Sequence, residues 1–178
     1  MVEAEGQPAR VQSIDETGFL CLLQPLLPLA LRLAHGMLRS PSEAEDMVQE
    51  ASLKAWTKLH TFQVGRDFKS WYLTIVANEC RQTLRSEWWR AIRMPFLERG
   101  SSQPPQDQVV TGDEVHRALA RLSYDHRLAI VLRFYLDLSF EEIGNTLRIS
   151  PQTARSRTHR ALARLRPIFN VPEVLAND

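Results

Sequence analysis

Apolar residues recur at spacings of three and four along most of the chain, and this spacing is typical of amphipathic helices. Strict alternation of apolar and polar residues, which would indicate strands, has no convincing example, and the chain has only seven glycines. The pattern therefore predicts an all-α fold of two small helical domains joined by a flexible linker, with no sheet.

Segments rich in polar residues, glycine and proline set the expected domain boundaries. We expect a mobile tail at 1–14, a linker at 94–112 and a second tail at 171–178. The first helical domain then covers 15–93, and the second covers 113–170.

Three helices are predicted in the first domain. The first covers Glu16 to Leu38, and Pro25 and Pro28 should kink or restart it. The second begins with Ser40 as its N-cap, and the third covers roughly Phe68 to Arg93.

The second helix carries an acidic and amide face opposite its apolar side. Asp46, Gln49, Glu50 and Leu53 follow one another at spacings of three and four, so they share one face. Asp46 and Glu50 could in principle form an acid/base pair, but no cleft-forming sequence and no nucleophile accompany them. The face is therefore predicted to bind a partner.

The third helix carries a narrow polar stripe beside a wide apolar arc. The stripe changes from small hydrogen-bonding residues to basic and then aromatic ones: Ser70, Thr74, Asn78, Arg81, Arg85 and Trp88. Amides and hydroxyls read base edges, arginines bind phosphates and indoles stack on unpaired bases, so the stripe suits a nucleic-acid strand. The alternative is an ordinary solvated helix face.

The end of the second domain has the character of a helix-turn-helix. Ser139 and Glu142 form a predicted capping box, and Gly144 is small enough for a close helix crossing. After a short turn, Ser150 is the predicted N-cap of the next helix, with Pro151 at its first position.

The helix that follows has polar residues opposite its buried side. Gln152, Ser156, His159 and Arg160 are central, and Arg155, Arg157 and Arg164 flank them. Base-reading side chains between arginines are what a major-groove helix needs. The alternative is an arginine-rich surface helix, but arginines without neutralising acids repel one another unless an anion is bound.

Charge is distributed unevenly along the 178 residues. The chain has 22 basic and 21 acidic residues, a net charge of +1 that taken alone argues against nucleic-acid binding. Residues 41–50, however, carry acids without Lys or Arg, whereas 151–166 carry arginines without acids. One end is therefore predicted to bind a basic partner and the other an anionic one.

Several other functions have little support in the sequence. The apolar run from Phe19 to Leu33 is interrupted by prolines and polar residues, so we expect no membrane insertion and a cytoplasmic protein. Cys21 and Cys80 are expected to be buried, reduced thiols. The histidines lack metal-ligand spacing, and no glycine-rich phosphate loop is present, so we expect no metal, no cofactor and no catalytic residue.

Taken in order, three strings resemble the extracytoplasmic-function (ECF, group 4) sigma factors of the bacterial RNA polymerase sigma superfamily, over roughly residues 15–168. The first string is Ala44, Glu45, Asp46, Met47, Val48, Gln49 and Glu50, then Ala55 and Trp56. The second is Phe68, Ser70, Trp71, Ile75, Ala77, Asn78, Arg81, Leu84 and Arg85. The third is Leu138, Ser139, Glu141, Glu142 and Ile143, then Ile149, Ser150, Thr153, Arg155, Ser156, Arg157, Arg160, Ala161 and Leu165.

The resemblance implies a non-catalytic specificity subunit that directs promoter recognition, DNA melting and transcription initiation. It implies three partners: core RNA polymerase, through its beta and beta-prime subunits, promoter DNA and an anti-sigma factor. The regulon implied is a stress or envelope response under anti-sigma control.

The resemblance also assigns site residues. Polymerase binding falls to Asp46, Gln49, Glu50, Leu53 and Trp56. The minus-ten element falls to Ser70, Trp71, Thr74, Asn78, Arg81, Arg85 and Trp88, and the minus-thirty-five element to Gln152, Thr153, Arg155, Ser156, Arg157, His159, Arg160 and Arg164.

Two other functions fit part of the chain. A stand-alone regulator that binds an operator as a dimer would explain the helix-turn-helix but leaves the acidic face and the polar stripe without a role. An adaptor that sequesters a partner helix on the acidic domain would make no DNA contact. Binding of duplex DNA in the absence of polymerase would favour the stand-alone regulator. Absence of any DNA contact in a polymerase complex would favour the adaptor.

Overall fold

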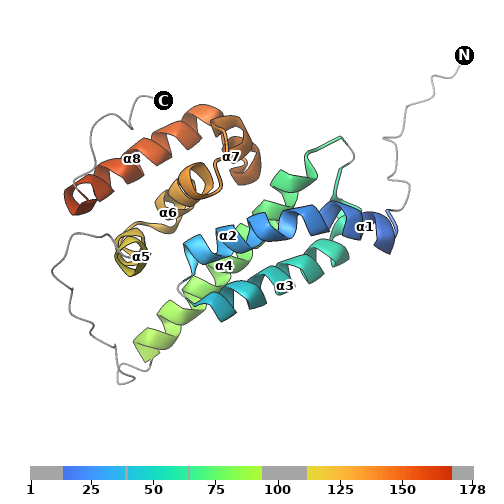
Figure 1. Ribbon diagram of the computed structural model, residues 1–178, viewed down its shortest axis with the longest axis horizontal. Coiled ribbons are helices and arrows are strands. Elements are labelled where there is room, and N and C mark those ends of the chain that lie inside the picture. The colour runs from blue at the N-terminus through green and yellow to red at the C-terminus, as the bar shows by residue number, and fades with distance from the viewer. Residues whose placement is uncertain (1–13, 39, 64, 94–111, 170–178) are drawn as a thin grey trace, which may run out of the picture.

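The chain is helical wherever the structure describes it. A computed structural model describes residues 14–38, 40–63, 65–93 and 112–169, and these contain helices and no strand (Figure 1). The expected all-α fold is confirmed for this part of the chain. The expected tails at 1–14 and 171–178 and the expected linker at 94–112 lie outside the described residues except for residue 14 and Gly112, and Gly112 is the first residue of a helix.

The first half, residues 14–93, contains four α-helices and two 3₁₀ turns. They are α1 (Glu16–Leu23), η1 (Gln24–Leu26), α2 (Leu27–Met37), α3 (Pro41–Thr57), η2 (Leu59–Thr61) and α4 (Phe68–Arg93). Pro25 lies within η1 and Pro28 lies in the first turn of α2, so the expected restart of the first helix is observed. Ser40 caps α3 by accepting a hydrogen bond from the Glu43 backbone, as expected.

The apolar stretch Glu16–Met37 is long and hydrophobic enough to cross a membrane by length and composition, with a mean hydropathy of 1.5. It is not one continuous α-helix, because η1 interrupts it. Leu20 and Leu22 of α1 are exposed, but Leu33, Ala34 and Met37 of α2 are fully buried where α2 packs against α3 and α4. We therefore assign α2 to the core of the first half.

The second half, residues 112–169, contains α5 (Gly112–Ala120), α6 (Tyr124–Ile130), the π-helical turn η3 (Val131–Tyr135), α7 (Phe140–Leu147) and α8 (Pro151–Phe169). The predicted capping box at the start of α7 is present: Ser139 Oγ accepts from the Glu142 backbone at 3.2 Å, and the Glu142 carboxylate accepts from the Ser139 backbone at 2.8 Å. Ser150 caps α8 through the Thr153 backbone at 3.1 Å. The predicted helix-turn-helix is therefore formed.

The turn between α7 and α8 is tight. Arg148 takes the left-handed backbone conformation, with φ of 56°. A Cβ on Gly144 would lie 2.8 Å from the backbone oxygen of Ile149, so the turn passes too close for any side chain. The expected role of Gly144 in a close approach is thus confirmed.

The two halves pack against each other. Helix α4 contacts α7, and α2 contacts η3, so the buried apolar residues form one continuous cluster across both halves (Figure 1). Gly36 of α2 lies at a close approach between the halves, because a Cβ there would lie 2.6 Å from a methyl group of Val131.

One expectation about the cysteines is wrong. Cys80 is fully buried on α4, but Cys21 is exposed on α1. The buried side of α1 is formed by Phe19 and Leu23, and Cys21 falls between them on the opposite face.

Candidate nucleic-acid and protein interfaces

Helix α3 presents one polar face with two large apolar side chains on it. The expected partner-binding residues Asp46, Gln49, Glu50, Leu53 and Trp56 are all exposed there. Leu53 is 59% exposed and Trp56 is 42% exposed. Acids beside exposed apolar side chains form a surface that a protein partner could cover.

Lys54 anchors this face to α4. Its Nζ lies 3.3 Å from the Glu50 carboxylate, one turn away, and 2.6 Å from the carboxylate of the buried Glu79. The hydrogen bond to Glu79 is the main reason that the pKa of Lys54 is raised above its usual value. Lys54 therefore stays protonated and partly neutralises the charge of Glu50.

The N-terminal turn of α4 is fixed by Asp67. Its carboxylate accepts hydrogen bonds from the backbone and hydroxyl groups of Ser70, at 3.0 and 2.7 Å. Ser70 is consequently buried, at 5% exposure, and its hydroxyl is committed to the cap. The neighbouring Trp71 is half-buried and packs against the rings of Phe62 and Phe68.

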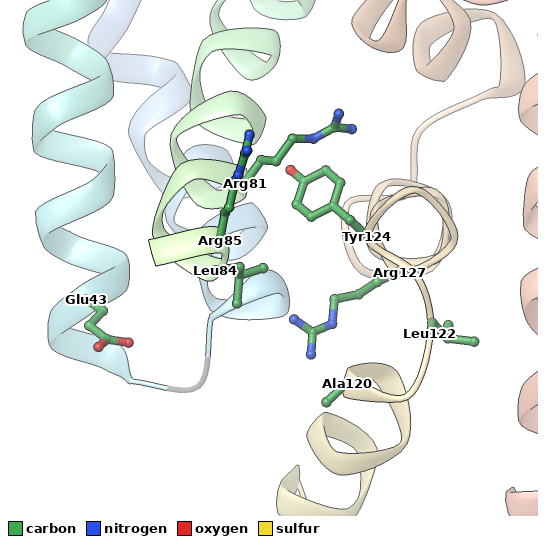
Figure 2. A pocket seen from close by; sticks show the side chains of 8 residues that line it. All are labelled: Glu43, Arg81, Leu84, Arg85, Ala120, Leu122, Tyr124 and Arg127. Carbon is green, nitrogen blue, oxygen red and sulfur yellow. The ribbon is translucent and has the colours of Figure 1, made fainter. Parts of the chain in front are cut away.

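The rest of the predicted stripe on α4 faces outward from the first half. Asn78, Arg81 and Arg85 are exposed, and Thr74 is half-buried. Arg81 lies on the ring of Tyr124, with its guanidinium carbon 4.4 Å from the ring centre (Figure 2). Trp88 belongs to α4, but its side chain lies outside the described residues.

Helix α8 carries the other set of predicted DNA contacts. Gln152, Thr153, Arg155, Arg160 and Arg164 are exposed, whereas Ser156, Arg157 and His159 are half-buried. Ser156 has a short side chain between Gln152 and Arg160, each one turn away, and these longer side chains can cover it. The arginines leave one side of α8 strongly basic.

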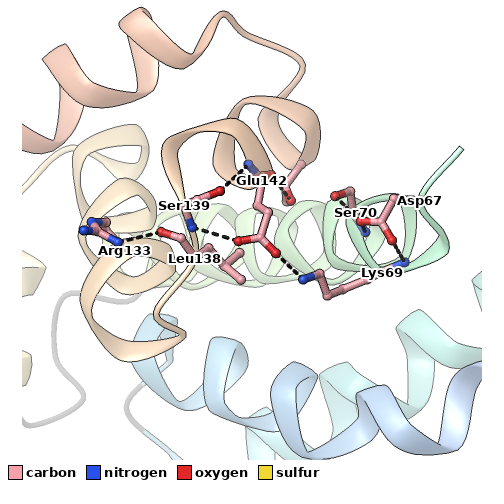
Figure 3. A network of polar contacts seen from close by, with 8 residues as sticks. Asp67, Lys69, Ser70, Arg133, Leu138, Ser139 and Glu142 are labelled. Atoms are coloured by element: carbon pink, nitrogen blue, oxygen red, sulfur yellow. Dashed lines mark hydrogen bonds and ion pairs between the residues drawn. The ribbon is translucent and has the colours of Figure 1, made fainter.

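Sequence reasoning did not identify the ion pairs that join α4 to the second half. Asp125 on α6 lies 2.6 Å from Arg81, and Glu142 on α7 pairs with Lys69 (Figure 3). The hydrogen bond from Lys69 is the main reason that the pKa of Glu142 is lowered, and the Ser139 backbone adds to it. Glu142 is 73 positions from Lys69 in the chain, so no local pattern could have revealed this pair.

His126 lies beside the basic side of α8. Burial lowers its pKa below the ordinary value of 6.5, and the charges of Arg164 and Arg160 lower it further. Both effects favour the neutral imidazole over the charged one near the arginines that are predicted to meet DNA.

A cavity of about 490 Å³ lies where α4 faces α5 and α6. Figure 2 shows Arg81, Leu84 and Arg85 on one wall and Tyr124 and Arg127 on the other. Among the described residues, no group of three or more His, Cys, Asp or Glu side chains is arranged to hold a metal ion. The lining offers basic and apolar groups and the carboxylate of Glu43, but no nucleophile beside a base.

Two family profiles match the chain. Sigma-70 region 2 matches residues 22–90, which covers most of the first half, and Sigma-70, region 4 matches residues 118–167, which covers most of the second half.

Several curated proteins are similar over most of the chain. The RNA polymerase sigma factor SigV of Bacillus subtilis is 30% identical over 141 residues, which are 76% of this chain and 81% of that protein. The RNA polymerase sigma factor CarQ of Myxococcus xanthus is 33% identical, and the match covers 78% of this chain and 81% of that protein. The ECF RNA polymerase sigma factor SigM of Mycobacterium tuberculosis is 34% identical, with 75% and 68% covered.

Two solved structures share the fold. The sigma factor RpoE of Bartonella quintana, solved in complex with the anti-sigma factor NepR, has a TM-score of 0.68 and 29% identity, covering 86% of this chain and 99% of that one. CnrH, solved in complex with the cytosolic domain of CnrY, has a TM-score of 0.64 at 22% identity, covering 88% and 90%.

Proposed function

The chain belongs to the extracytoplasmic-function family of RNA polymerase sigma factors, and from this premise we propose how its surfaces divide the work of promoter recognition. Helix α3 binds core RNA polymerase, α4 captures the melted minus-ten strand, and α8 reads the minus-thirty-five duplex. The chain acts as a non-catalytic specificity subunit in the cytoplasm.

The exposed face of α3 is the observation that carries the proposal. Leu53 and Trp56 are large apolar side chains left exposed on the same face as Asp46. Such side chains become the anchors of an interface when a partner covers them, and neighbouring acids select a basic partner. We assign this face to the beta and beta-prime subunits, which fits the resemblance of the string around Asp46 to the polymerase-docking helix.

The α4 stripe fits an unpaired strand better than a duplex. Asn78 offers an amide to base edges, and Arg81 and Arg85 offer guanidiniums to phosphates. Trp88, at the end of the stripe in the sequence, would add a stacking platform, which is worth about 1 to 3 kcal/mol per base.

The α8 helix fits the major groove. Arg160 is exposed on the side away from the buried Ala161 and Leu165, where it can reach a base edge. Arg155 and Arg164 are exposed to either side and fit phosphates. Removal of a base-reading arginine and removal of a phosphate-binding arginine should therefore have different effects on promoter binding.

Regulation by an anti-sigma factor is supported by the RpoE structure, which was solved in complex with the anti-sigma factor NepR. We propose that an inhibitory protein of this kind controls this chain and that the regulon is a stress or envelope response.

Run-off transcription with core RNA polymerase on a promoter library tests the whole proposal. Wild-type chain should direct transcripts from a subset of promoters that core polymerase alone does not use. The Asp46→Ala, Glu50→Ala double variant should lose most of its binding to core polymerase, because stranding an interfacial charge costs about 2 to 5 kcal/mol. Wild-type pull-down by this variant would refute the assignment of α3.

The same assay separates the two kinds of DNA contact. Arg160→Ala should cost about 1 to 3 kcal/mol and relax discrimination at one position of the upstream element. Arg164→Ala should weaken all sequences alike and flatten the salt dependence by about one unit of slope. Unaltered promoter choice by the Arg160 variant would remove α8 from base recognition.

A further inference from the structure

Part of the side of α4 assigned above to the melted strand contacts the second half of the same chain, although Asn78, Arg81 and Arg85 remain exposed. Lys69 pairs with Glu142 of α7 (Figure 3). The hydroxyl of Thr74 lies 2.6 Å from the backbone oxygen of Thr146, and Arg81 donates to Asp125 at 2.6 Å. Thr74 and Arg81, two of the groups proposed for DNA, are thus bound within the protein.

Asp125 contacts both proposed DNA surfaces at once. One carboxylate oxygen lies 2.6 Å from Arg81 of α4, and the other lies 4.0 Å from Arg157 of α8. A carboxylate offers a guanidinium the same kind of charged acceptor that a phosphate does. Asp125 therefore takes the place that a phosphate would take on each arginine.

Asn78, another polar residue of the stripe, is exposed but borders the space between the halves. Asn78 lines a cavity of about 400 Å³ between the halves, with Thr74, Tyr124, Thr146 and Arg157 on its other walls. A strand that contacted Thr74 and Arg81 together would have to displace Thr146 and Asp125, which already bind these groups. Capture of the strand and the observed packing are therefore mutually exclusive.

The ion pairs between the halves are suited to opening, whereas the shared apolar cluster holds the halves together. Arg81 and Asp125 are 54% and 48% exposed, and Lys69 and Glu142 are about one-third exposed. Exposed ion pairs contribute little stability and are screened by salt. The packing of Gly36 against Val131 adds a close apolar contact without a side chain on the α2 side.

We propose that the free chain is self-inhibited: Asp125 occupies a phosphate position on Arg81 of α4 and Arg157 of α8, the pair of Glu142 with Lys69 adds a second contact between the halves, and the halves must separate before promoter DNA can bind. This inference rests on the proposed function, since it assumes that α4 and α8 bind DNA. The inhibitory element is part of the chain and acts before any anti-sigma factor does.

Charge variants test the acidic contacts. Asp125→Asn keeps the shape of the side chain and removes its charge attraction to Arg81 and Arg157. Glu142→Gln likewise removes the charge attraction to Lys69, and a glutamine at this position preserves the capping box. Asp137→Asn is the matched control, because it removes one charge from an exposed position of the second half, at a left-handed φ of 56° that asparagine tolerates.

A steric variant tests the same contact without changing any charge. Gly36→Ala places a Cβ 2.6 and 3.0 Å from the two methyl groups of Val131, and this β-branched side chain has little freedom to move aside. Gly112→Ala is its control, because nothing lies within 4 Å of the added atom.

Two measurements on the full chain are needed. Small-angle X-ray scattering gives the radius of gyration of the free chain, and run-off transcription gives the chain concentration for half-maximal output at fixed core polymerase. Asp125→Asn should enlarge the radius and lower that concentration about two- to five-fold, the range expected for losing an exposed ion pair. Gly36→Ala should shift both readouts in the same direction.

The proposal is overturned if both variants match wild type in both readouts, or if Asp137→Asn gives the same gain as Asp125→Asn. An enlarged radius with no gain in transcription also overturns it. Failure of the proposed function is a different result, in which the wild-type chain directs no promoter-specific transcripts. The scattering needs neither polymerase nor DNA, so it separates the two failures.

Discussion

Ser52 and Tyr72 share one chain of hydrogen bonds in the core of the first half. Ser52 Oγ donates to the backbone oxygen of Val48 at 2.7 Å and lies 2.8 Å from the hydroxyl of Tyr72. Because serine has one hydroxyl hydrogen, Tyr72 must be the donor of the second bond. Tyr72 is fully buried, so its hydroxyl depends on Ser52 for an acceptor.

Substitutions of Tyr72 and of Ser52 should therefore lower the free energy of unfolding by different amounts. Tyr72→Phe removes a donor and leaves Ser52 bonded, at an expected cost of about 0.5 to 1.5 kcal/mol. Ser52→Ala strands the buried hydroxyl and should cost about 1 to 3 kcal/mol. Urea unfolding measures both. The double variant should be close to Tyr72→Phe alone, and equal costs for the two single variants would contradict this assignment of donor and acceptor.

His126 should make the stability of the fold depend on pH. Its pKa is lowered by burial and by Arg164, Arg160 and Arg157, and only Asp125 opposes this. Below the ordinary value of 6.5 the unfolded chain then binds more protons at this site than the folded chain does, so stability falls as pH drops through that value and is level above it. Urea midpoints at pH 5.5 and 7.5 should differ more for wild type than for His126→Gln. An identical pH response of the two proteins would show that His126 is not perturbed.

At the scale of the element, the turn between α7 and α8 depends on a single small residue. Gly144→Ala would bring a Cβ to 2.8 Å from the Ile149 oxygen and 3.4 Å from the Pro151 nitrogen, both of which are backbone atoms. Overpacking of this kind typically costs about 1 to 3 kcal/mol, which should outweigh the gain of about 1 kcal/mol from replacing glycine in a helix. Thermal unfolding should show a lower midpoint. A raised midpoint would mean that the turn can relax.

The helices were predictable from sequence because their signals are local. Helix α4 has the predicted limits of Phe68 and Arg93, and the capping residues Ser40, Ser139 and Ser150 act where their spacing places them. The exposure of Cys21 was not predicted, because the apolar run around it gives no clear period. The exposed α3 face was predicted. The hydrogen bond of Ser70 to the cap was not, because it depends on the position of the Asp67 carboxylate.

At the scale of the whole molecule, the packing of the two halves could not be predicted. The residues that join them are far apart in the chain: Arg127 donates to the backbone oxygen of Met37 across 90 positions, and Arg32 donates to that of Tyr135 across 103. Each of these arginines resembles an ordinary surface residue in sequence. Only the fold shows that Arg127 is buried at the contact.

Salt should loosen this packing. The pairs of Lys69 with Glu142 and of Arg81 with Asp125 are partly exposed, and at 1 M salt the screening length falls to about 3 Å. The radius of gyration of the wild-type chain should therefore rise between 0.05 and 1 M sodium chloride. The Asp125→Asn, Glu142→Gln double variant should respond less. An unchanged or smaller radius at high salt would indicate that apolar contacts alone hold the halves together.

The two cysteines differ in exposure, so their rates of alkylation report how often the core of the unmodified chain opens. Cys21 is open to solvent, whereas Cys80 is fully buried and its pKa is raised to about 12 by burial. The thiolate is the nucleophile that attacks an alkylating reagent, so Cys80 can react only when α4 transiently exposes it to solvent and lets it ionise. Mass spectrometry during alkylation should show one label added at once and a second added slowly. The rate of the second addition measures how often the core beneath the α4 stripe opens in the native protein.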